Sequence, residues 1–237
     1  MKMAPFTNLA GVVFFLLFLL TGIITAQTQL FNIPTSEVAD TGSRYLELDF
    51  DSHLASYRFG GYQGFGFTGV YGLHKKVEIG LNGYIFKDAD GWSPLEIQPN
   101  IKFQVYESKK KGISVAAGTV AFIPLSKRWS TDPIANIYAV AGKKFEGKFG
   151  PSIHAGAYAI AGRTNDQRYG FLTGIEQPVN ERVTIIADWT SGNNRFGYAT
   201  AGLGVALTQR STLYAAYYVG NEGRGNNSLG LYYSYSF

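Results

Sequence analysis

The chain has 237 residues, of which 46% are hydrophobic, 15% aromatic and only 16% charged, with a formal net charge of +4. This composition is too apolar for a disordered chain and too polar for a bundle of membrane helices. The absence of cysteine excludes disulfides, thiolate metal sites and thiol nucleophiles, and the small charge excess gives no basis for nucleic-acid binding. Abundant tyrosine and phenylalanine favour a single all-β domain.

Residues 1–26 differ from the rest of the chain and read MKMAPFTNLAGVVFFLLFLLTGIITA. Lys2 gives this stretch a positive start, an uncharged run extends from Leu9 to Ile24, and Ala26 ends a short stretch suited to cleavage. The uncharged run is shorter than the roughly 20 residues that span a bilayer, so a membrane anchor is the less favoured alternative. We expect residues 1–26 to be a secretory signal peptide that is removed after Ala26.

The rest of the chain, from residue 44 onward, alternates between apolar and polar residues in segments separated by Gly, Asn, Asp and Lys clusters, which is typical of β-strands. We predict twelve strands, at residues 44–51, 61–73, 76–86, 95–106, 113–124, 134–143, 151–162, 169–177, 182–190, 197–207, 211–219 and 227–237. Tight turns alternate with longer loops between them, as in an up-and-down barrel whose two ends face different surroundings. Residues 27–43 precede the first strand and are predicted to be a periplasmic segment, either an extended arm or a small plug.

The fourth predicted strand contains a proline at position 99. Pro99 has no backbone N–H to donate to a strand ladder. The sequence therefore predicts either a bulge at this position or a strand that begins near Asn100.

One face of the predicted strands is apolar and the other is polar. In residues 95–106 the apolar face consists of Leu95, Ile97, Ile101, Phe103 and Val105. Charges fall on the opposite faces of the strands, at Glu47, Asp49, Glu78, Glu96, Lys102, Glu176 and Asp188. A dry core would need a partner for each of these charges, whereas a polar lumen would not. We therefore predict a twelve-stranded antiparallel up-and-down transmembrane β-barrel at residues 44–237, with its apolar face toward lipid.

The last eleven residues, NSLGLYYSYSF, form a predicted strand that ends on an aromatic residue. Its alternating apolar positions include Leu231, Tyr233, Tyr235 and Phe237, which suit the aromatic girdle at a membrane boundary. In this pattern the chain resembles the bacterial outer-membrane β-barrel family, in which such a final strand is the signal read by the barrel-assembly machinery. The resemblance implies a location in the bacterial outer membrane, with outer-membrane lipid and the assembly machinery as partners.

The polar face is expected to line a lumen. The predicted lumen-lining residues are Glu47, Asp49, Glu78, Tyr84, Glu96, Lys102, Tyr138, His154, Tyr158, Glu176 and Asp188. Because acidic residues outnumber Lys102 in this set, an open lumen is expected to favour cations or small neutral solutes over anions. The interpretation is a non-enzymatic channel, or porin, for passive passage of small solutes, without catalytic residues, cofactor or metal. The main alternative is a closed barrel that acts as a structural or surface-interaction protein through its outer loops.

A barrel hydrolase is the third possibility. Outer-membrane phospholipases resemble this chain in size and strand number, and they use a Ser, His and Asn set. His154 faces the predicted lumen, and the neighbouring Ser152 has no evident carboxylate partner, so the requirements of a nucleophile and its base are not met.

A protease is the other form of this third possibility. Asp49, Asp51 and His53 share one face near the predicted loop that contains Asp88 and Asp90. The arrangement faintly resembles the aspartate and histidine site of omptin-type proteases, in which such groups activate water. Solvated charges at the rim of the barrel are the favoured explanation, because omptin-type barrels also have fewer strands.

Overall fold

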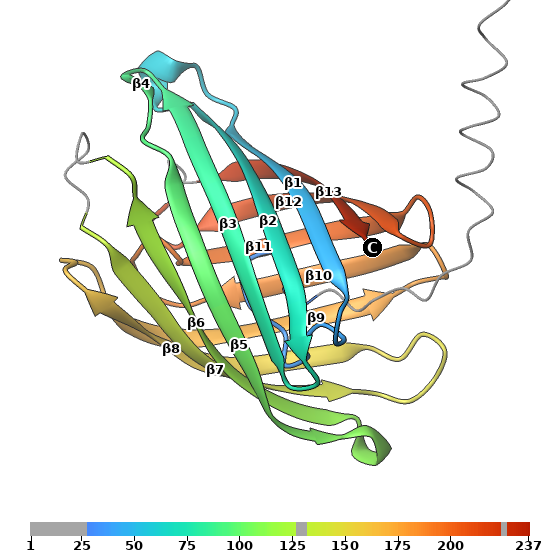
Figure 1. Cartoon of the computed structure of the whole chain (residues 1–237). Helices are drawn as coiled ribbons and strands as arrows, with labels where there is room; N and C mark the ends of the chain where they lie inside the picture. The colour runs from blue at the N-terminus through green and yellow to red at the C-terminus, as the bar shows by residue number, and fades with distance from the viewer. Residues whose placement is uncertain (1–27, 127–131, 224–226) are drawn as a thin grey trace, which may run out of the picture.

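The computed structural model describes residues 28–126, 132–223 and 227–237, so the predicted signal peptide lies outside the described residues. Twelve long antiparallel strands form one closed up-and-down barrel (Figure 1). Their bounds are β1 (Arg44–His53), β2 (Tyr62–His74), β3 (Val77–Asp88), β5 (Glu96–Ser108), β6 (Ile113–Pro124), β7 (Ile134–Lys144), β8 (Ser152–Gly162), β9 (Tyr169–Pro178), β10 (Val183–Thr190), β11 (Tyr198–Ala206), β12 (Ser211–Gly220) and β13 (Ser228–Ser236). The predicted fold class is confirmed, and every predicted strand matches an observed one to within two residues at each end.

Each long strand pairs with its neighbours along the chain, and β1 pairs with β13 to close the ring. The connections contain two short 3-10 helices, η1 (Tyr57–Phe59) and η2 (Lys109–Lys111), and the two-residue strand β4 (Gly91–Trp92). Among the residues that the structure describes, no helix is long and apolar enough to cross a membrane. Short turns and longer loops alternate, except that the connection between β7 and β8, residues 145–151, is as long as the loops. The loops that carry η1 and β4 lie together at one end of the barrel (Figure 1). We call this the long-loop end and the opposite end the short-turn end.

The outer surface of the barrel is apolar, and much of the inner surface is polar. Along β13, Leu231 and Tyr233 are each 41% exposed, whereas the intervening Tyr232 and the following Ser234 are buried. The same alternation exposes large apolar side chains on other strands, such as Phe171 on β9. A broad apolar surface is unfavourable in water but matches the hydrocarbon core of a bilayer. The apolar face therefore points outward, as the sequence predicts.

Pro99 lies within β5, and both predicted ways of accommodating it are wrong. β5 already begins at Glu96, and its pairing with β3 continues through Pro99, which lies opposite Leu81. The pairing with β6 is interrupted next to Pro99 and resumes in the same register. The register shift of β5 against β6 lies elsewhere, between Gln104 and Tyr106. Pro99 is exposed on the outer face, and the lapse in pairing on the β6 side is where its missing N–H is accommodated.

The seam of the barrel joins the first long strand to the last. Eight residue pairs connect β1 with β13. Beyond them, the backbone N–H of Phe237 donates a hydrogen bond to the carbonyl oxygen of Arg44 at 2.9 Å. The end of the chain is therefore held in the ladder, and closure leaves no sheet edge with unpaired backbone groups in the membrane.

Deletion of Phe237 is expected to lower the amount of folded barrel in the outer membrane, because it removes the last bond of the seam and the aromatic end of the final strand. The Phe237 ring is 64% exposed and packs edge-on against Tyr235, with ring centroids 4.8 Å apart. Heat-dependent electrophoretic migration of membrane extracts measures the folded fraction. The control Phe59→Ala removes an exposed aromatic ring from η1 and should leave that fraction unchanged. Normal levels of the truncated protein would contradict the prediction.

Candidate functional site

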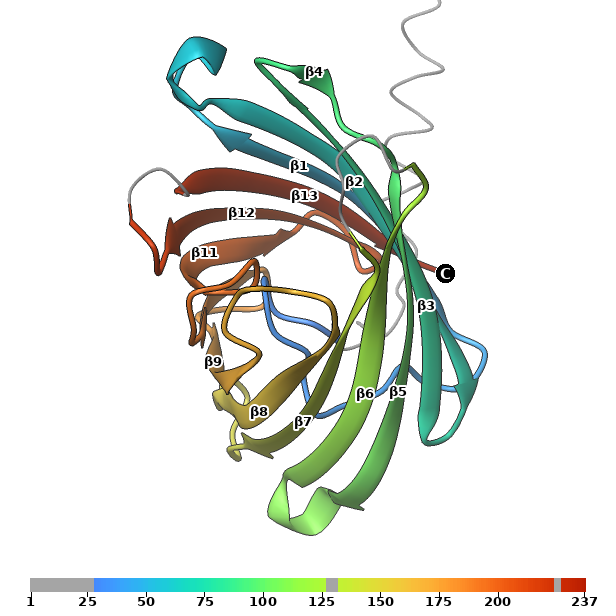
Figure 2. The same cartoon turned by 90° about the vertical axis from the view of Figure 1, so that its left-hand side faces the viewer.

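The lumen is the candidate functional site. Its wall is largely polar, and the N-terminal segment folds into it. We call residues 28–41 the plug segment; in Figure 2 this blue stretch crosses the space enclosed by the strands. Its first part is a tight hairpin, in which the N–H of Leu30 donates to the Ile33 carbonyl at 2.8 Å and the N–H of Thr35 to the Thr28 carbonyl at 3.1 Å. Leu30 and Ile33 are almost fully buried. The described part of the segment therefore folds inside the lumen and is not an extended arm.

The tip of the plug segment is held by a carboxylate on β10. The backbone N–H of Asn32 donates to Asp188 Oδ2 at 2.7 Å, and the side-chain Nδ2 of Asn32 donates to Asp188 Oδ1 at 2.9 Å and also to Thr200 Oγ1. Next to it, Phe31 packs against three inward-facing rings, with centroid distances of 6.2 to 6.5 Å: Tyr214, Tyr218 and Tyr232. Asp188, predicted to line the lumen, is therefore satisfied by the plug segment.

A buried ion pair holds the plug segment near both of its ends. Lys102 on β5 lies opposite Glu78 on β3, and Lys102 Nζ is 3.0 Å from Glu78 Oε1. Lys102 Nζ also donates to the Thr28 carbonyl at 2.7 Å, while the N–H of Ala39 donates to Glu78 Oε2 at 2.7 Å. Buried charges are tolerated only when their remaining hydrogen-bonding capacity is filled. The backbone of the plug segment fills it here for both partners of the pair.

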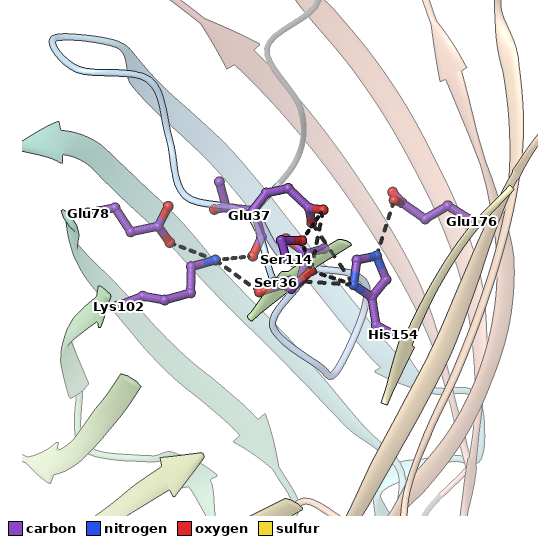
Figure 3. A network of polar contacts seen from close by, with 9 residues as sticks. Ser36, Glu37, Glu78, Lys102, Ser114, His154 and Glu176 are labelled. Atoms are coloured by element: carbon purple, nitrogen blue, oxygen red, sulfur yellow. Dashed lines mark hydrogen bonds and ion pairs between the residues drawn. The ribbon is translucent and has the colours of Figure 1, made fainter. Parts of the chain in front are cut away.

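A second polar cluster lies beside the ion pair, around His154 on β8 (Figure 3). Ser36 Oγ is 2.6 Å from Ser114 Oγ and 3.4 Å from His154 Nδ1, and Ser114 Oγ donates to Glu37 Oε1 at 3.0 Å. His154 Nε2 faces Glu176 Oε2 at 3.8 Å. The cluster thus joins the plug segment to β6, β8 and β9.

This cluster contains the residue types of a serine hydrolase but not its geometry. The separation of Ser36 Oγ from His154 Nδ1 is long, and His154 Nε2 lacks a hydrogen-bond partner. Ser36 and His154 are 0% and 1% exposed, so a substrate has no access to either. Ser152, considered from the sequence, lies opposite Glu176 in the β8–β9 register and lines a different part of the lumen. The described residues therefore favour a structural role for the cluster.

The residues considered for a protease site do not form one. The imidazole Nδ1 of His53 bonds the backbone carbonyl of Asn227, and its ring stacks on Tyr62. Asp49 accepts hydrogen bonds from phenolic and threonine hydroxyls, and Asp88 accepts one from the backbone of Asp90. In the described parts of the chain, no hydrogen bond or ion pair joins His53 to an aspartate.

Two wall glycines make room for the plug segment. A Cβ at Gly174 on β9 would lie 2.4 Å from Leu30 Cδ1 and 2.8 Å from Ile33 Cδ1. A Cβ at Gly142 on β7 would lie 2.0 Å from Ser36 Oγ. All three distances are too short for real contacts, so the wall is shaped to the side chains of this segment.

Two cavities lie in the lumen among the residues that the structure describes. The long-loop cavity has a volume of about 320 Å³ and is lined by the hairpin of the plug segment and by predicted lumen residues, namely Glu47, Asp49, Glu78, Tyr84, Lys102 and Tyr138. The short-turn cavity has a volume of about 210 Å³ and is lined by residues that include Glu176 and Arg182. Tyr45 and Tyr214 line both, so the two cavities approach each other along that wall.

Two further predicted lumen residues lie toward the long-loop end. Glu96 forms a two-point ion pair with Arg195, at 2.8 and 3.0 Å, and Tyr158 donates to the Ser191 carbonyl at 2.6 Å and accepts from Asn194. The prediction omitted Arg195 because it lies in a loop, where alternation assigns no inward direction. The role of the whole set in the passage of a solute stays a prediction.

The predicted set of lumen-lining residues also omitted Asp51 and Asn32. Asp51 shares the inward parity of Asp49 and could have been included on that ground. Asn32 belongs to a segment without periodicity, so no sequence signal places it. Within the described residues, no group of three or more His, Asp or Glu side chains is placed to hold a metal ion.

Comparison with known proteins gives a fold but no family. No protein-family model and no curated protein sequence matches the chain. Among solved structures, the NanC porin aligns with 81% of this chain and 98% of its own, with a TM-score of 0.58 and 12% identity. The COG4313 outer membrane channel from Pseudomonas putida F1 aligns with 92% of this chain and 100% of its own, at a TM-score of 0.55 and 11% identity. The chain has the fold of outer-membrane β-barrels.

An enzyme shares this fold. The calcium-bound outer membrane phospholipase dimer from Salmonella typhi aligns with 85% of this chain and 92% of its own, with a TM-score of 0.50 and 13% identity. At these identities each similarity concerns the fold, so the choice between channel and enzyme depends on the residues of the lumen.

Replacing Lys102 with Met leaves Glu78 buried without its cation and is expected to lower the free energy of unfolding by about 3 kcal/mol. The double variant with Glu78→Gln should lose less than the sum of the two single variants, because it removes the uncompensated charge. Urea unfolding in lipid vesicles, followed by tryptophan fluorescence, measures these values. Lys148→Met breaks the exposed pair with Glu181 and serves as the control, for which no measurable change is expected. Strict additivity of the two single losses would show that the pair is not coupled.

Proposed function

We propose that the chain is a passive channel for small solutes in the bacterial outer membrane, with residues 28–41 as a plug in its lumen. The observation that carries the proposal is the layout of the interior, in which two cavities with charged and polar linings lie at opposite ends of one closed barrel. Such an interior suits a solute passage, and the lipid-compatible exterior suits a membrane location. The porin and channel structures with the same fold support the proposal.

The proposed location also draws on the two ends of the chain. A signal peptide at residues 1–26 would direct export, and the final strand with Tyr233, Tyr235 and Phe237 would be read by the barrel-assembly machinery. In this arrangement the short-turn end faces the periplasm, and the plug segment lies inside the lumen. The long loops then face the outside of the cell.

The chain is proposed to be non-enzymatic. Ser36 and His154 are buried away from both cavities, and His53 bonds a backbone carbonyl instead of a carboxylate. The described residues therefore offer no nucleophile with an aligned base at a surface that a substrate could reach.

A closed barrel is the second candidate, and the plug segment is the observation that favours it. Ion pairs, hydrogen bonds and rings fix this segment inside the lumen, as in small barrels whose interior is filled. The two candidates differ in one property, because a closed barrel passes no solute whether or not the plug segment is present.

Removal of residues 28–41 is expected to raise the permeability of the barrel to a small neutral sugar such as arabinose. Swelling of proteoliposomes that contain the full chain or the deletion variant measures this permeability. Faster swelling with the variant supports a channel whose main barrier is the plug segment. No swelling with either protein would contradict the channel and support the closed barrel, whereas equal swelling would show that solutes pass beside the segment.

A reversible lock tests the same barrier without deleting residues. Ser36 Oγ and Ser114 Oγ are 2.6 Å apart, so cysteines at both positions are close enough to form a disulfide in a chain that has no other cysteine. We expect slow swelling with the oxidised double variant and faster swelling after reduction with dithiothreitol. Ser36→Cys alone is the control, and its swelling should not respond to the reductant.

A further inference from the structure

The long-loop cavity has a wall of carboxylates along β1. Glu47, Asp49 and Asp51 alternate on the inward face of this strand, and all three line the cavity. Their opposite strands are β2 and β13, neither of which places a lysine or arginine beside them in the register. Three like charges on one wall repel each other unless something between them carries the opposite charge.

Each carboxylate is held by a phenol through one of its oxygens. Tyr45 donates to Glu47 Oε2 at 2.5 Å, Tyr84 to Asp49 Oδ2 at 2.6 Å, and Tyr232 to Asp51 Oδ1 at 2.7 Å. The phenols are neutral, so they orient the carboxylates without compensating their charge. The side chains of Glu47 and Asp49 also interact with each other. No lysine or arginine is paired with any of the three carboxylates within the described residues.

Asp49 lacks a hydrogen-bond donor for one of its oxygens among the residues that the structure describes. Its side chain is only 5% exposed, and its Oδ1 has no hydrogen-bond partner, although Asp49 lines the cavity. A buried carboxylate oxygen without a partner is costly, and nearly all such atoms in proteins are satisfied. A ligand with a charged donor group would satisfy it once the Asp49 side chain turns toward the cavity.

The basic residues of the cavity are already neutralised. Lys102 is paired with Glu78 at 3.0 Å and Arg195 with Glu96 at 2.8 Å. None of the ion pairs within the described residues includes a carboxylate of the β1 wall. The cavity therefore has a net negative wall that no internal cation balances.

The rest of the lining is aromatic. Phe31 from the plug segment, together with Tyr214, Tyr218 and Tyr232, forms a cluster of rings at the edge of the cavity. Aromatic faces attract cations and also pack against apolar rings. A wall of carboxylates beside a cluster of rings suits a ligand with an ammonium group on a small aromatic or apolar body.

We propose that the long-loop cavity binds a small organic cation, with its ammonium group at Asp49 and its apolar body against the ring cluster. A volume of about 320 Å³ accommodates a molecule the size of benzylamine. The inference rests on the proposed channel function, since it names the class of solute that the lumen accepts. The competing explanation is a proton shared between the Glu47 and Asp49 carboxyl groups, which needs no ligand.

Binding is tested with three probes of similar shape: benzylammonium, neutral benzyl alcohol and anionic benzoate. Isothermal titration calorimetry on the full-length barrel in detergent measures affinity without requiring passage. We expect benzylammonium to bind at least about 10-fold more tightly than either other probe. Asp49→Asn should weaken its binding about 10-fold, while Asp166→Asn, the same change in an exposed loop, should have no effect. Heat-dependent migration confirms that each variant folds, and Asp51→Asn provides a second test of the wall.

Three results would overturn the inference: equal affinity for the three probes, no binding of benzylammonium, or unchanged binding by Asp49→Asn. The last would agree with a proton shared between the two carboxyl groups. Passage is measured separately, by the reversal potential of planar bilayers in a benzylammonium chloride gradient with the plug-deleted barrel. Tight binding without any conductance would support the organic-cation site and contradict the channel. Conductance without selective binding would support the channel and contradict the organic-cation site.

Discussion

The requirement that every backbone hydrogen bond be made within the sheet governs this structure. A strand edge in a bilayer would leave N–H and C=O groups without partners, so the sheet must close, and here it closes where β1 meets β13. Closure fixes which face of each strand points outward, because side chains alternate along a strand. The apolar exterior and the polar interior then follow from the same pattern, and the interior becomes the place where charges such as Glu78 and Lys102 gather.

A polar interior creates a second requirement, because a barrel of this width leaves space beside its charged groups. The plug segment fills part of that space and supplies backbone donors and acceptors where the wall needs them, for example the N–H of Ala39 for Glu78 and the Thr28 carbonyl for Lys102. Its apolar residues Leu30 and Ile33 join a hydrophobic cluster with inward-facing side chains of the wall. The carboxylates of β1 line the same cavity as the hairpin of the segment, but within the described residues no hydrogen bond joins the two.

Most of the barrel could be predicted from the sequence, because period-two alternation and turn residues are local signals that survive in every strand. The inward direction of Asp49, Glu78 and Asp188 followed from the same parity. Pro99 was misjudged because its effect depends on which neighbouring strand its nitrogen faces, which a single strand does not reveal. The position of the plug segment depends on contacts between residues far apart in the chain, such as Asn32 with Asp188, and no periodicity encodes those. The ion pair of Glu96 with Arg195 could not be predicted from the sequence for the same reason.

The glycines at positions 142 and 174 have a consequence for how this sequence can change over time. These positions suit glycine because Ser36, Leu30 and Ile33 occupy the volume that a side-chain methyl group would need. The inner surface of the barrel wall is therefore complementary in shape to the plug segment. Substitutions in either part are constrained by the other. A bulkier residue in the wall requires the side chains of the segment to shift or to be smaller, so related proteins that keep this plug should show correlated substitutions at these positions. Relatives that have lost the plug should instead carry larger residues where the two glycines stand.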